Sequence, residues 1–259
     1  MGTFLFDKII FGPVKSRRLG ISLGVNLLPV DRKICSFDCI YCECGRNLVS
    51  SGIKSHMPSR SEVSDHLEKK LSGMKEAGGL PDVITFAGNG EPTLHPQFAG
   101  IIDDTVALRN QFAPRARIAV LSNATMLHRE DVFNALLKID DNIQKIDSAS
   151  EDTIKLLDCP AKNFSLAKTV EQLARFGGKV IIQTMFITGT FQGKRVDNTT
   201  SFEIDEWLKL LKEIKPSQVM IYTIDRDAPV ETLEKVPVDV LHRIAGLVKT
   251  EGFDVQVSG

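Results

Sequence analysis

The sequence predicts an α/β protein whose parallel sheet, with helical crossovers, forms a partial (β/α)6 TIM barrel. Strand-like and helix-like segments alternate about six times along the chain, which is typical of parallel sheets. Residues 180–186 are almost continuously apolar, as expected for a strand covered on both faces. Periodicity alone also permits a doubly wound open sheet. Because no internal repeat, low-complexity tract or long linker is visible, a single domain over residues 1–259 is the simplest expectation.

Apolar spacing and boundary residues support the individual elements. In the first expected helix, Val63, Leu67 and Leu71 fall on one face. Ser59, with Glu62 three residues later, resembles its capping box. The expected strands cover residues 21–28, 83–86, 118–121, 143–146, 180–186, 219–222 and 253–257. The expected helices cover residues 61–74, 96–109, 128–137, 164–176, 204–214 and 238–249.

A cysteine-rich loop follows the first expected strand. Cys35, Cys39 and Cys42 have the spacing C-x3-C-x2-C, and Tyr41 precedes the last of them. Three thiolates on so short a loop can each bind one iron of a cubane cluster, which leaves the fourth iron open to a small molecule. With Cys44 they can alternatively enclose zinc, although no second C-x2-C pair is present. An odd number of cysteines and no secretory signature disfavour disulfides.

A glycine-rich segment follows the expected strand at residues 83–86. Gly88 and Gly90 allow the backbone to approach a ligand closely. Glu91 is suited to binding the ammonium group of an amino acid. The alternative is a tight turn before a helix.

Polar residues also follow the later strands, where ligands bind in α/β barrels and sheets. The polar residues that come directly after an expected strand are either ligand-binding residues or helix caps. A glutamine inside an apolar strand needs a partner, since an unpaired buried amide costs free energy. The candidates are Ser122, Asn123, Asp147, Ser148, Gln183 and Tyr222.

Charged residues before the first expected strand and after the expected strand at residues 219–222 are candidates for substrate binding. Arg17 and Arg18 lie in a loop punctuated by glycine and proline, and arginine forks match carboxylates and phosphates. Asp225 and Arg226 follow Tyr222. Solvated surface charge is the alternative for the paired arginines.

The cysteine loop resembles the cluster motif of the radical S-adenosylmethionine (radical SAM) superfamily, including the aromatic Tyr41. The segment Gly88-Asn89-Gly90-Glu91-Pro92 resembles that superfamily's Gly-Gly-Glu-Pro motif, with Asn89 in place of the first glycine. The resemblance implies the same partial barrel and two cofactors, a [4Fe–4S] cluster and S-adenosylmethionine. It also implies that Cys35, Cys39 and Cys42 bind the cluster.

The resemblance further implies a reaction. One electron, supplied by a donor such as flavodoxin or ferredoxin, cleaves S-adenosylmethionine to methionine and a 5′-deoxyadenosyl radical, which abstracts hydrogen from an unidentified substrate. Residues 88–91 would hold the methionyl end of S-adenosylmethionine. Asp147 and Ser148 would bind its ribose or carboxylate.

The order of motifs along the whole chain resembles a compact radical SAM subgroup related to the tRNA wyosine-base synthases. Outside the cluster motif only Cys44 and Cys159 remain, too few for an ordinary second cluster. The open alternatives are a glycyl-radical-enzyme activase, a tRNA-modifying enzyme and a non-catalytic metal-binding module.

The overall charge and hydropathy restrict the partners. The net charge is −1, so charge does not indicate a nucleic-acid partner. No apolar run approaches the ~18 residues that a membrane span needs, and the N-terminus does not resemble a signal peptide. A reducing cytoplasm is expected, which suits an oxygen-sensitive cluster.

Overall fold

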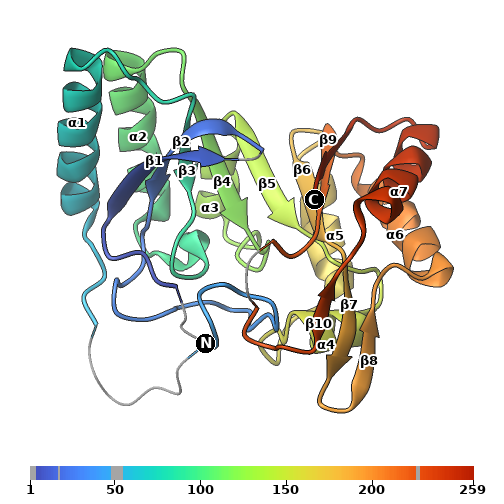
Figure 1. Cartoon of the computed structure of the whole chain (residues 1–259). Coiled ribbons are helices and arrows are strands. Elements are labelled where there is room, and N and C mark those ends of the chain that lie inside the picture. Colours follow the sequence, from blue (N-terminus) through green and yellow to red (C-terminus); the bar gives the residue numbers. More distant parts are fainter. Residues whose placement is uncertain (1–3, 17, 48–54, 226–227) are drawn as a thin grey trace.

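The computed structural model describes residues 4–16, 18–47, 55–225 and 228–259. Its centre is an eight-stranded sheet in the order β1-β2-β3-β4-β5-β6-β9-β11 (Figure 1). These strands are β1 (Ile10–Ser16), β2 (Gly20–Val25), β3 (Val83–Phe86), β4 (Arg117–Ser122), β5 (Asp141–Lys145), β6 (Ile181–Met185), β9 (Gln218–Tyr222) and β11 (Val255–Ser258). From β2 to β11 every neighbouring pair is parallel, whereas β1 is antiparallel to β2.

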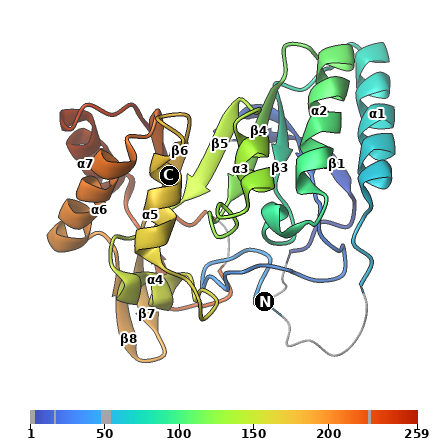
Figure 2. The ribbon, with the colours of Figure 1, turned by 180° about the vertical axis from the view of Figure 1, so that it is seen from behind.

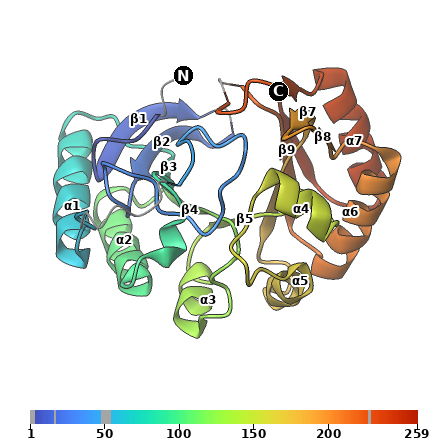
Figure 3. The ribbon, with the colours of Figure 1, turned by 90° about the horizontal axis from the view of Figure 1, so that it is seen from below.

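Helices connect the parallel strands and cover the convex side of the curved sheet (Figure 3). They are α1 (Arg60–Glu76), α2 (Phe98–Phe112), α3 (Glu130–Leu136), α5 (Leu166–Ala174), α6 (Ser201–Ile214) and α7 (Val238–Thr250). The short helix α4 (Glu151–Leu157) lies instead at the carboxyl ends of the strands (Figure 1). A doubly wound sheet would carry helices on both faces. The expected partial (β/α)6 barrel is therefore confirmed.

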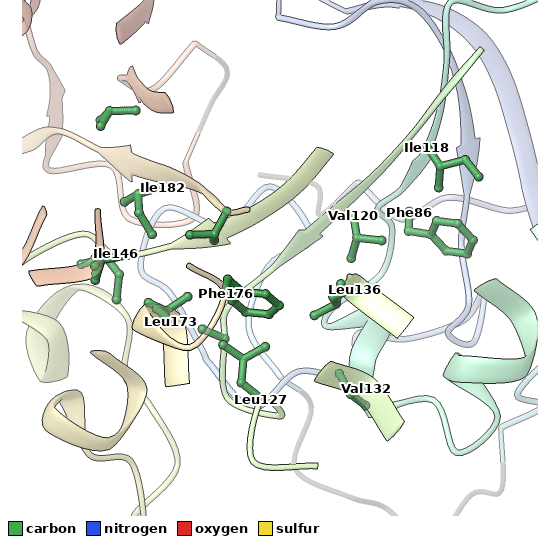
Figure 4. Close-up of a cluster of buried hydrophobic side chains, with 14 of the residues drawn as sticks. Phe86, Ile118, Val120, Leu127, Val132, Leu136, Ile146, Leu173, Phe176 and Ile182 are labelled. Atoms are coloured by element: carbon green, nitrogen blue, oxygen red, sulfur yellow. The ribbon is translucent and has the colours of Figure 1, made fainter. Parts of the chain in front are cut away.

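Side-chain alternation along the strands builds two apolar layers. Between sheet and helices, Ile118 and Val120 of β4 pack in the same buried cluster as Val132 and Leu136 of α3 (Figure 4). On the concave side a smaller cluster is formed by one buried residue from each of five strands, with Leu19, which precedes β2, and Leu121 of β4 packed against it. The strand residues are Val83, Ala119, Ile143, Ile181 and Met220. The concave side is thus filled at the level of these residues.

Three parts of the fold differ from the sequence-based expectation, and one of them is the short helix α4, which was not expected. Residues 10–16 form the edge strand β1, although the glycine and proline in this stretch indicated a loop; an edge strand tolerates such residues. A separate antiparallel sheet consists of β7 (Ile187–Phe191), β8 (Lys194–Asp197) and β10 (Leu233–Lys235). Within the described ranges, no helix is long and apolar enough to cross a membrane.

The expected capping box of α1 is confirmed. The Ser59 side chain accepts a hydrogen bond from the Glu62 amide, and the Glu62 carboxylate accepts one from the Ser59 amide. Two otherwise orphaned amides at this helix end are thereby satisfied.

Replacing Ser59 with alanine is expected to lower the free energy of unfolding by about 1 kcal/mol, because the cap is lost. Urea unfolding followed by circular dichroism measures this change. The matched control is Ser72→Ala in the middle of the same helix, where the serine is not a cap. An equal loss in both variants would contradict the capping role.

Candidate functional site

The cysteine loop lies at the carboxyl ends of the strands, beside α4 and the small sheet (Figure 2). A short backbone bridge joins it to the segment after β3. The Ile34 amide donates to the Asn89 carbonyl at 2.9 Å, and the Glu91 amide donates to the Ile34 carbonyl at 3.0 Å. Gly90 makes this approach possible, because a Cβ atom there would lie 1.8 Å from the Ile34 carbonyl oxygen.

The other side of the loop is held by the end of α4. The Asp38 amide donates to the Asp158 carbonyl, and the Ile40 amide donates to the Leu157 carbonyl, both at 2.9 Å. Phe37 packs in an apolar cluster with the loop, α4 and the small sheet. The loop is therefore attached to two parts of the barrel that are far apart in sequence.

The three cysteines of the motif are free thiols with different environments. Cys39 is buried, whereas Cys35 and Cys42 are half-buried. Burial raises the pKa of Cys35 to about 12, and the nearby Glu91 carboxylate adds to this. The neighbouring Cys44 side chain, together with the Lys33 ammonium, lowers the pKa of Cys42 to about 6 despite burial.

This donor set fits an iron–sulfur cluster. The sulfurs of Cys35, Cys39 and Cys42 share one short loop, and cysteine thiolates are the usual ligands of such clusters. In the described part of the chain, no three His, Cys, Asp or Glu side chains are grouped to hold one metal ion. The Cys44 sulfur donates to the Gly88 carbonyl at 3.4 Å.

Glu91 is a buried carboxylate next to the cysteine loop. One of its oxygens accepts from the Thr93 amide at 3.1 Å, and the other accepts from the Asn123 amide at 2.6 Å. Burial raises the pKa of Glu91, while these hydrogen bonds oppose the increase. A buried carboxylate held in this way is suited to binding a cation, because such a partner would offset its desolvation.

Asn123, at the end of β4, supports the cysteine loop directly. Its side-chain amide nitrogen, Nδ2, donates to the Ser36 hydroxyl at 2.9 Å and approaches the Cys35 sulfur at 3.6 Å. Its amide oxygen accepts from the Thr125 hydroxyl at 2.8 Å. The neighbouring Ser122 hydroxyl accepts from the Ala124 amide, as a cap does.

Tyr41 and Asp147 meet in a buried ionic network. The Tyr41 hydroxyl donates to the Asp147 carboxylate and, at 3.3 Å, to Asp158. Lys145 pairs with both carboxylates, at 2.7 Å in the case of Asp158. Burial raises the pKa of Asp158 to about 7. Burial lowers the pKa of Lys145, but the carboxylates of Asp147 and Asp158 outweigh burial and leave that pKa raised. This network attaches the aromatic residue of the motif to β5 and α4.

Asn89 and Ser148 are hydrogen-bonded within the protein. The Asn89 amide group exchanges two hydrogen bonds with the Phe6 backbone and donates a third to the Pro29 carbonyl. The Ser148 hydroxyl donates to Glu203 at 2.6 Å. These contacts hold the N-terminal segment and α6 against the barrel.

Comparison with known families settles the class of protein. Residues 32–197, more than half of the chain, match the family model of the radical SAM superfamily. The chain belongs to the radical SAM superfamily. With this membership come the superfamily's cofactors, a [4Fe–4S] cluster and S-adenosylmethionine, as the cysteine motif predicted.

Two curated relatives illustrate how this radical SAM protein compares in length. A UPF0026 protein of Methanocaldococcus jannaschii is 30% identical over 243 residues, which cover 92% of this chain and 70% of the relative. A GTPase Obg of Brachyspira hyodysenteriae is 31% identical over 222 residues, which cover 86% of this chain but 31% of the relative. The chain therefore spans less than a third of that second protein.

Two solved structures share the fold. A radical SAM methyltransferase from Sphaerobacter thermophilus has a TM-score of 0.67 and 15% identity, with 92% of this chain and 65% of that chain covered. Streptococcus suis SuiB, solved with S-adenosylmethionine bound, has a TM-score of 0.63 and 14% identity, with 91% and 50% covered. At these identities the likeness shows the fold, and the relation to wyosine-base synthases stays a prediction.

On the concave side, this radical SAM protein brings Gln183, Tyr222 and Arg18 together. The Gln183 amide nitrogen donates to the Tyr222 hydroxyl at 2.9 Å, and the Arg18 guanidinium lies 4.6 Å from the Tyr222 ring centroid. Burial raises the pKa of Tyr222 to about 12, with a contribution from Asp147. The buried Gln183 Oε1 and Arg18 Nη1 atoms have no hydrogen-bond partner within the described chain.

Of the remaining charged candidates, Asp225 is the one within the described residues. Asp225 lies 3.9 Å from the Lys235 ammonium of β10. Arg17 and Arg226 lie outside the described residues. Three residues near the cysteines were not identified from the sequence, namely Lys33, Lys145 and Asp158, because no motif spacing marks them.

Gly90→Ala is expected to lower the free energy of unfolding by about 2–4 kcal/mol, since the new methyl group would collide with the Ile34 carbonyl at a positive φ of 131°. Chemical denaturation of the apoprotein measures the loss. Gly73→Ala in α1 is the control, because no atom lies within 4 Å of its added Cβ. That control should be neutral or stabilising by up to ~1 kcal/mol. A Gly90→Ala protein as stable as the control would refute the close approach.

Proposed function

We propose that this protein is a radical SAM enzyme in which Cys35, Cys39 and Cys42 bind three irons of a [4Fe–4S] cluster. The observation that carries the proposal is the bridge between Ile34 and Gly90, which brings the cysteine loop beside the buried carboxylate of Glu91. When bound, the cluster would supply one electron to S-adenosylmethionine, which releases methionine and a 5′-deoxyadenosyl radical for hydrogen abstraction from a substrate.

The protein's own residues position the cofactors. Glu91 binds the ammonium group of the methionyl end, since a buried carboxylate gains most from a cation placed against it. Asn123 holds the cysteine loop through Ser36, and the network around Tyr41 holds its far side. The small sheet and α4 cover the loop with apolar side chains, which limits access of water. Fixed binding and orientation are the usual contributions of a protein to cofactor chemistry.

The proposal also includes a location for the substrate and a class of electron donor. We place the substrate on the concave side, near Tyr222 and the partnerless buried atoms of Gln183 and Arg18. A low-potential one-electron donor of the flavodoxin or ferredoxin class supplies the electron. A reducing cytoplasm suits both the free thiols and the cluster.

Serine substitution of the motif cysteines should remove the cluster. The wild-type protein, reconstituted anaerobically, is expected to hold about four irons per chain and to release 5′-deoxyadenosine with dithionite and S-adenosylmethionine. Cys39→Ser should lose most of the iron and the product, as measured by iron analysis and chromatography. Cys159→Ser is the control and should retain both. A colourless wild-type protein that contains zinc and no iron would instead support a metal-binding module.

Neutralising Glu91 should weaken cofactor binding without removing the cluster. Glu91→Gln is expected to raise the Kd for S-adenosylmethionine by about ten- to a hundredfold, because a buried charge pair is lost. Equilibrium dialysis of cluster-loaded protein measures the Kd, and circular dichroism checks the fold. The exposed Glu76→Gln in α1 should bind normally. Unchanged affinity in a folded Glu91→Gln protein would argue against this role.

A further inference from the structure

A buried lysine lies inside the cysteine loop. The Lys33 side chain is 2% exposed, although ammonium groups are almost never fully buried unless they are paired. Its Nζ donates to the Gly45 carbonyl at 2.9 Å and lies 3.5 Å from a carboxylate oxygen of Asp38. Asp38 stands between the first two cysteines of the motif, and Gly45 follows the third. The ammonium group is therefore enclosed by the segment that carries the cluster ligands.

The nearby carboxylate balances this charge only in part. Asp38 also pairs with Arg46 at 2.9 Å and accepts the Asn47 amide at 2.7 Å, so its charge is shared between two cations. Removing an ammonium from water costs several kcal/mol when it is not compensated. Further negative charge near Lys33 is therefore needed.

Cys35, Cys39 and Cys42 supply that negative charge when they bind iron as thiolates. The Lys33 ammonium is held by Asp38 and Gly45 inside the loop that carries these three cysteines, so its buried charge lies in the same loop as the ligand set.

We infer that Lys33 is a positioning residue that raises the reduction potential of the bound cluster through its buried charge. The inference rests on the proposed function, since it requires that the three cysteines hold the cluster. Net charge, hydrogen bonds to sulfur and solvent exposure determine the potential of an iron–sulfur cluster. Reduction adds one negative charge to the site, and a buried cation stabilises the reduced form more than the oxidised form.

The test is a redox titration of reconstituted protein, followed by electron paramagnetic resonance, without S-adenosylmethionine. At the solution potential where the wild-type cluster is half reduced, Lys33→Met should lower the ratio of reduced to oxidised cluster by about tenfold or more, as expected for a lost charge at an effective dielectric constant near 20. Lys33→Arg keeps the charge and should restore most of the ratio. Lys155→Met removes an exposed lysine of α4 and should titrate like wild type.

The possible outcomes distinguish a failure of this inference from a failure of the proposed function. A fully loaded Lys33→Met protein that titrates like wild type would overturn the inference. If this variant does not load iron, Lys33→Gln keeps an N–H donor without the charge and is titrated in its place. Failure of both to hold the cluster, with native circular dichroism, would make Lys33 an assembly residue and also overturn it. A wild-type protein that takes up no cluster would instead refute the proposed function.

Discussion

The site depends on the backbone bridge between Ile34 and Gly90. Two hydrogen bonds across this bridge bring a loop that follows β2 against a loop that follows β3. The candidate ligand cysteines lie on the first loop and the candidate ammonium-binding carboxylate of Glu91 lies on the second. The absence of a side chain at residue 90 is therefore a condition for placing the two functional groups side by side. The parallel pairing of β2 with β3 fixes the register of this bridge.

A buried ionic network provides the second attachment of the loop. Tyr41, Asp147, Asp158 and Lys145 come from the loop, the end of β5 and the end of α4. Burying these charges costs desolvation free energy, so the network is weak evidence for overall stability. Its directional hydrogen bonds define where the loop sits. Specificity of position is what a cofactor site needs most, because small displacements reduce catalysis strongly.

Sequence patterns were sufficient for the elements and motifs that depend on local spacing. Val63, Leu67 and Leu71 marked α1, Ser59 marked its start, and the cysteine spacing marked the candidate cluster site. Partners distant in sequence were not predictable, because no periodicity relates them: Tyr41 and Asp147 are 106 residues apart. The small sheet was also missed, since its strands are short and pair outside the main barrel. From the sequence alone, the buried Lys33 cannot be distinguished from an exposed lysine.

The two attachments of the cysteine loop have a consequence for biosynthesis. The thiols occur early in the chain, but the groups that hold the far side of the loop, Leu157 and Asp158, are made more than a hundred residues later. Chains are synthesised from the N-terminus, so the cysteines leave the ribosome before their support exists. Cluster insertion into an ordered loop is therefore a late event, and the nascent thiols must stay reduced until α4 has been made.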